Sequence, residues 1–160
     1  DHWLDGYSTF WGADAVYKYN SPKAYGQGDV TLQAEYLYRR IDLEVEEHLI
    51  APAVVGNDKI SEQDGFYAQA LYGFAPRWRG GLRLDMVGLT NSEELPNDTD
   101  NDFGESWRTS AMVDFSPSEF SRIRFQVSNG DYETEEGTEN VWEGFVQLVV
   151  SLGAHGAHNF

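Results

Sequence analysis

The sequence predicts an all-β protein, an antiparallel up-and-down sheet that closes into a transmembrane β-barrel. Apolar and polar residues alternate with a period of two in seven segments, which is the period of a β-strand. Short and long connections also alternate between these segments, as they do in outer-membrane barrels. Aromatic residues gather near the ends of the apolar faces, where a bilayer interface would lie: Trp11, Tyr17, Tyr19, Tyr36, Tyr38, Tyr72, Phe74, Trp107, Phe115 and Trp142.

The seven predicted strands account for most of the chain, and no segment has the pattern of a helix. They are 11–19, 30–39 (continuing to about 45), 65–75, 82–87, 107–115, 122–128 and 142–152. Turn residues predict short connections around 76–80 and 116–121 and a turn-rich stretch at 20–28. The segments 46–64, 90–105 and 130–140 are predicted as long acidic loops.

The strand count bears on the domain organisation. Barrels built from one bacterial chain usually have an even number of strands, whereas seven are predicted here. Residues 1–160 are therefore expected to form the C-terminal segment of a larger barrel, with no second domain. An eight-stranded barrel without its first strand is the smaller alternative.

Composition excludes several classes of protein. The net charge of −16 over 160 residues argues against nucleic-acid binding, which needs an excess of Lys and Arg. A content of 14% aromatic and 41% hydrophobic residues is too high for a disordered acidic chain. Without cysteine there is neither a disulfide nor a thiolate metal site. No apolar run reaches the roughly 18 residues that a transmembrane helix needs.

Charged residues of both signs occupy the polar face of the predicted strands. They are expected to line a wet lumen, and they are Asp14, Lys18, Glu35, Arg39, Arg83, Asp85, Arg108, Asp114, Arg122, Arg124 and Glu143. The same pattern also suits the solvent face of a soluble sheet. The arginines are able to line an anion path, but cross-strand salt bridges with Asp85, Asp114 and Glu143 are the preferred interpretation.

Two motifs suggest metal ligands. Asp98, Asp100, Asp102 and Gly104 form a D-x-D-x-D-x-G pattern, which differs from an EF-hand because Gly stands at position 7 and Thr109 at position 12. A weakly bound calcium ion or a solvated acidic loop both fit that pattern, and no other cofactor is expected. His155 and His158 are candidate ligands for zinc, copper or nickel, although a separation of three places them on opposite faces of a strand.

Three stretches carry a resemblance to a known family: WGADAVYKY at 11–19, SEFSRIRFQV at 118–127 and FVQLVVSLGAHGAHNF at 145–160. The residues of these stretches resemble the C-terminal barrel portion of Gram-negative outer-membrane proteins of the porin-like or TonB-dependent-receptor-like type. The resemblance implies a location in the bacterial outer membrane and a role in moving a solute. It also implies contact with membrane lipid and lipopolysaccharide, and it makes Phe160 the signal that the barrel-assembly machinery reads.

Other functions remain open at this stage. A barrel that serves as a structural sheath or scaffold would hold a partner protein in its lumen. A soluble β-barrel would bind a ligand around an apolar core. An enzyme is not expected, because no nucleophile motif such as G-x-S-x-G occurs.

Overall fold

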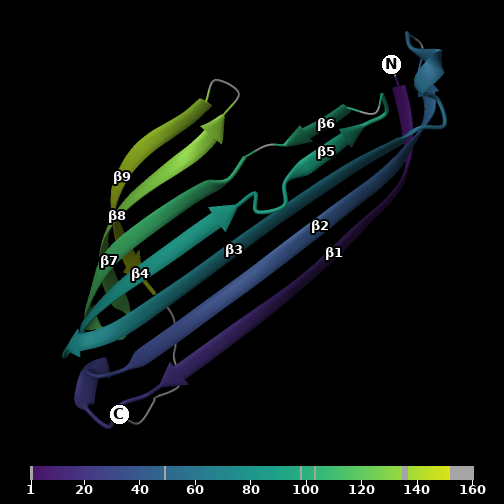
Figure 1. Ribbon diagram of the computed structural model, residues 1–160. Coiled ribbons are helices and arrows are strands. Elements are labelled where there is room, and N and C mark those ends of the chain that lie inside the picture. The colour runs from purple at the N-terminus through teal and green to yellow at the C-terminus, as the bar shows by residue number, and fades with distance from the viewer. Residues whose placement is uncertain (1, 49, 98, 103, 135–136, 152–160) are drawn as a thin grey trace.

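The computed structural model describes residues 2–48, 50–97, 99–102, 104–134 and 137–151, which form one antiparallel sheet of nine strands (Figure 1). The strands are β1 (His2–Tyr19), β2 (Val30–His48), β3 (Asp58–Ala75), β4 (Trp78–Val87), β5 (Ser92–Leu95), β6 (Thr99–Asp102), β7 (Ser106–Ser118), β8 (Ser121–Thr134) and β9 (Gly137–Val150). Two short 3₁₀ helices, η1 (Ala24–Gly26) and η2 (Pro52–Val54), lie in the connections. Neither of these helices has the length or apolarity needed to cross a membrane.

The strand order confirms the predicted up-and-down sheet. The main path runs β1-β2-β3-β4-β7-β8-β9, and each neighbouring pair is antiparallel. These are the seven segments that the alternation predicts. Two short strands were not predicted: β5 pairs with residues 60–62 near the start of β3, and β6 pairs with β5. Figure 1 shows this extra hairpin alongside β3, and it shows the sheet curving from β4 towards β9. Within the described residues the sheet is open, with β1 and β9 at its two edges.

The predictions of long acidic loops were largely wrong, because the strands extend through most of them. Pairing between β2 and β3 is unbroken from Glu44↔Asp58 to Val30↔Tyr72, so only 49–57 connects the two strands. The predicted loop at 130–140 is mostly strand, since β8 continues to Thr134 and β9 begins at Gly137. The segment 90–105 contains β5 and β6.

One close backbone approach joins the β1–β2 connection to β3. The amide of Gly28 donates to the carbonyl of Gly73 at 2.6 Å, and the amide of Gly73 donates to the carbonyl of Asp29 at 2.9 Å. A Cβ atom at position 73 would overlap the carbonyl oxygen of Gly26. Glycine at this position therefore lets the connection dock against β3.

We expect Gly73→Ala to lower the free energy of unfolding by about 1–3 kcal/mol, the usual cost of overpacking a tight contact. The clash is with backbone atoms, so it is relieved only by moving the 24–29 segment. Gly144→Ala is the matched control, because a Cβ there meets its nearest atom, the carbonyl oxygen of Gln126, at 3.9 Å. Urea unfolding followed by circular dichroism compares the two variants, and equal midpoints would contradict the assigned contact.

Candidate functional site: a charged face and an apolar face

The strand register brings all the predicted lumen residues to one face of the sheet. The clearest row runs Asp14↔Glu35, Glu35↔Tyr67, Tyr67↔Asp85 and Asp85↔Arg108 across five strands. The other predicted residues follow from this row by the period of two, since Lys18, Arg39, Arg83, Asp114, Arg122, Arg124 and Glu143 each have the same parity on their strand. We call this the charged face, and its lining of a lumen stays a prediction.

The opposite face, which we call the apolar face, carries no charged residue over a stretch of nine residues on most strands. These stretches are 11–19 on β1, 30–38 on β2, 66–74 on β3, 78–86 on β4, 107–115 on β7 and 142–150 on β9. Its large side chains are open: Leu82 is 63% exposed, Phe125 52% and Leu148 68%. Among the described residues, Val45 is the one buried hydrophobic side chain. The apolar side chains of this sheet therefore do not form a core of their own.

Aromatic side chains form a belt at each end of the apolar face. At one end the ring of Trp11 lies 5.4 Å from that of Tyr36 and 5.6 Å from that of Tyr38. At the other end Trp78 stacks on Phe115 with centroids 4.6 Å apart. The strand ends Tyr17, Tyr19, Tyr72 and Phe74 belong to this second belt, and Phe66, Trp107 and Trp142 belong to the first.

Asp114 is the centre of the first ion-pair cluster on the charged face. Its carboxylate accepts from Nε and Nη2 of Arg124 at 2.7 and 2.9 Å and from Nη2 of Arg79 at 2.8 Å. The residue is 1% exposed. A buried carboxylate needs such partners because its desolvation is otherwise strongly unfavourable.

Asp85 is the centre of the second cluster. It accepts from Arg83 at 2.7 Å and from Arg108 at 3.3 Å. Glu143 lies farther away, 4.0 Å from Nη1 of Arg108. The structure thus joins Asp114 and Asp85 to two arginines each, and salt bridges between these residue types were predicted from the sequence. Arg79 was missed because it fell in a predicted turn, although it continues the period of Arg83 and Asp85.

Neutral polar side chains connect the clusters to the rest of the charged face. Gln33 donates to the hydroxyl of Tyr67 at 2.6 Å and accepts from Gln69 at 2.9 Å. The hydroxyls of Ser110 and Ser128 share a hydrogen bond of 2.8 Å, and both residues are buried. The buried side chains of this region are thus polar, whereas the core of a soluble protein is mainly apolar.

The two faces exchange character above the belt of Trp11 and Tyr38. On β2 the side chains of Ile41, Leu43 and Val45 lie on the same face as Arg39, whereas Asp42 and Glu44 lie on the side of the apolar face. Arg40 on that side pairs with Glu62 at 2.8 Å. This hydrogen bond is the main cause that raises the pKa of the Arg40 guanidinium. The apolar band therefore has a defined upper limit.

Several predicted sites fall outside the described residues. Asp98, His155, His158 and Phe160 are not described, and for Asp100 and Asp102 the structure gives only their strand positions in β6. Over the part of the chain that the structure describes, no three His, Asp or Glu side chains converge to hold a metal ion. The calcium and histidine hypotheses are therefore untested.

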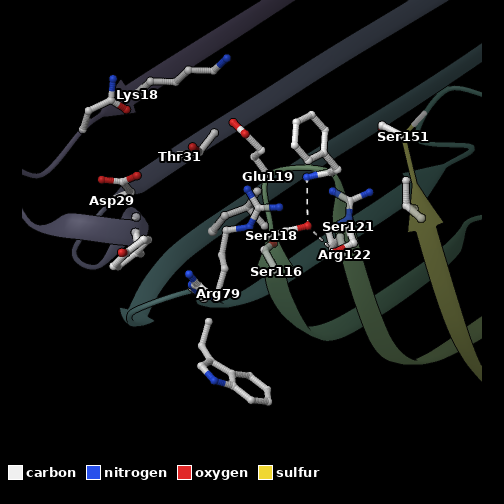
Figure 2. A pocket seen from close by; sticks show the side chains of 18 residues that line it. Lys18, Asp29, Thr31, Arg79, Ser116, Ser118, Glu119, Ser121, Arg122 and Ser151 are labelled. Atoms are coloured by element: carbon white, nitrogen blue, oxygen red, sulfur yellow. Dashed lines mark hydrogen bonds between the residues drawn. The ribbon is translucent and has the colours of Figure 1, made fainter. Parts of the chain in front are cut away.

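A hollow of about 600 Å³ opens at the end of the sheet where the short turns lie. Figure 2 shows that Lys18, Arg79 and Arg122 line it from three different strands, together with Asp29 and Glu119 from the connections. Ser118 and Ser121, one on each side of the β7–β8 turn, share a hydrogen bond of 2.8 Å at its rim. Arg79 and Arg122 also line a second hollow deeper along the charged face.

Comparison with known proteins gives one relative and no assigned activity. No protein-family model matches the chain, and no solved structure matches it. The chain is similar to a protein of Aquifex aeolicus (strain VF5) whose description reads "Uncharacterized protein", with 29% identity over 166 residues. The match covers 99% of this chain and 32% of that protein, so the chain spans about a third of its relative's length.

We expect Asp114→Asn to destabilise the fold by about 1–3 kcal/mol, because it leaves two guanidinium groups without their shared carboxylate. The figure is kept below that of a fully buried ion pair since the Arg79 and Arg124 side chains are 39% and 24% exposed. Asp14→Asn is the control, because Asp14 is exposed and lies opposite Glu35. Unfolding midpoints in urea test the pair, and an unchanged midpoint for Asp114→Asn would refute the structural role of the cluster.

Proposed function

We propose that this chain forms part of the wall of an outer-membrane β-barrel whose charged face lines a passage for a solute. The observation that carries the proposal is the inverted distribution of side chains. Leu82 and Leu148 are mostly exposed, while Asp114 and Ser110 are buried. Burying apolar surface is the main driving force of folding in water, so a soluble sheet would cover its apolar face. Lipid would cover it equally well.

The height of the apolar face supports a membrane location. Nine residues extend about 30 Å along a strand, which is about 21–25 Å across a bilayer at a tilt of about 35–45°. Outer-membrane barrels have an apolar band about 25 Å tall, bounded by aromatic girdles. The belts around Trp11 and Trp78 stand at the two ends of such a band.

Closure of the sheet is part of the proposal. A sheet edge in the hydrocarbon region would leave backbone N–H and C=O groups without partners, at a cost of several kcal/mol for each group. The edges of β1 and β9 therefore need further strands. The relative from Aquifex aeolicus is about three times as long as the matched region, so a protein of that length has ample chain for them.

We expect Val146→Arg to destabilise the protein in detergent or lipid by about 2–4 kcal/mol, the cost of a cation at the bilayer midplane. Val146 stands at the middle of the 142–150 stretch and is 66% exposed. In water an exposed substitution of this kind changes stability by only about 0.5 kcal/mol.

The matched control is Phe145→Arg, because Phe145 is the neighbouring residue, is also exposed and lies on the charged face. We expect this variant to stay within about 0.5 kcal/mol of the wild-type protein. Unfolding of both variants in lipid vesicles measures the difference. Equal effects of the two substitutions would argue against lipid on the apolar face and in favour of a soluble barrel.

The passage itself is tested by conductance of the full-length protein in a planar lipid bilayer. A channel gives discrete conductance steps that scale with salt concentration. Stable insertion without conductance would contradict the solute passage and favour a sheath or scaffold whose lumen holds a partner protein. A protein that stays monodisperse without detergent would overturn both membrane functions.

A further inference from the structure

Five arginines converge on one part of the charged face. They come from three adjacent strands, and together they line a hollow of about 410 Å³: Arg79 and Arg83 from β4, Arg108 from β7, and Arg122 and Arg124 from β8. The other polar groups around this hollow are neutral, contributed by Gln69, Ser110 and Gln126. None of the residues lining the hollow is acidic.

The aspartates of this region lie beneath the arginines and compensate only part of their charge. On the charged face of β4, β7 and β8 the acidic residues are Asp85 and Asp114, each shared between two arginines. Their side chains are 21% and 2% exposed, against 24–39% for the four arginines that they bind. The short carboxylates therefore lie close to the sheet, and the longer guanidinium groups extend over them into the hollow.

Arg122 lies in the hollow without a carboxylate of its own. None of the acidic side chains in the described part of the chain lies within 4.0 Å of its guanidinium group. Its Nε is buried and has no hydrogen-bond partner among the described residues, and the same holds for Nε of Arg108. Unsatisfied buried donors are unfavourable, so oxygen acceptors placed here would be bound favourably.

We propose that this hollow binds an oxyanion, a phosphate or carboxylate group of the solute, and thereby makes the passage selective for anions. Guanidinium groups present planar, paired N–H donors that match the oxygens of both groups. Rings of arginine select anions in pores by the same interaction. The selectivity rests on the proposed function, whereas binding of the anion requires only the folded wall.

Glu143 lies 4.0 Å from Arg108 beside this group of arginines, whereas the acidic residues farther along the strands are too distant to oppose the site. Among the acidic residues beyond the belt of Trp11 and Tyr38, Asp42, Glu44 and Asp58 lie on the side of the apolar face. They lie at least nine residues along their strands from the level of the hollow at Gln69 and Gly81, which is about 30 Å or more. At physiological ionic strength their field is screened over about 8 Å.

Binding is tested first, on the full-length protein in detergent, by titration calorimetry with inorganic phosphate and with citrate. We expect Arg122→Gln to weaken binding of the preferred anion by roughly ten-fold or more, since a hydrogen bond between charged groups is lost. This variant should fold, because the structure gives Arg122 no ion pair to break. Arg40→Gln is the matched control, since it removes an equal charge from the other face and should change the affinity by less than two-fold.

Reversal potentials in a salt gradient across a planar bilayer then test selectivity. Anion preference that falls in Arg122→Gln but not in Arg40→Gln supports the proposal, and stronger competition by phosphate or by citrate identifies the group that is bound. Conductance without anion binding, or with equal behaviour of both variants, would overturn the anion site and leave the solute passage intact. Anion binding without conductance would overturn the solute passage and leave the anion site intact.

Discussion

The separation of charged and apolar side chains onto opposite faces of one continuous sheet is the constraint on which this structure depends. A strand offers only two directions to its side chains, and a shift of one residue in any pairing would exchange the two faces. Register is unbroken along most of β2 and β3, so the separation is maintained from strand to strand. Each strand then fixes the faces of its neighbours, from Asp14 on β1 to Glu143 on β9.

The charged face solves a problem that this separation creates. Charges removed from water need partners, and the sheet provides most of them across neighbouring strands, as for Asp114, and some along one strand, as for Arg83 and Asp85. Asp114 on β7 joins Arg79 on β4 to Arg124 on β8, so one carboxylate ties three strands together. The hydroxyl pair of Ser110 and Ser128 repeats the connection between β7 and β8 without charge. Polar contacts between strands thus hold this part of the sheet together.

The sequence was sufficient to predict the up-and-down sheet and the face on which each residue lies, because both follow from a period of two. It was insufficient for the strand ends. Above Tyr38 the faces exchange character, and Ile41 and Leu43 continue the alternation in the opposite sense, so the pattern predicts this strand only to about residue 45. Strands β5 and β6 carry acidic residues with no apolar partner face, so no periodicity marks them. Their pairing depends on the free upper part of β3, a contact distant in sequence.

The sequence predicts which types of residue form the candidate site, but not how many arginines each aspartate binds. Alternation places arginines and aspartates on one face, and equal numbers would give closed ion pairs. Only the ion-pair distances show that Asp85 and Asp114 each bind two arginines and that Arg122 has no carboxylate partner among the described residues. The difference in side-chain length then decides which charge is presented, because Asp is too short to extend past Arg from the same sheet. The part of the charged face formed by β4, β7 and β8 therefore presents mainly guanidinium groups, and it is suited to receive an anion rather than a cation.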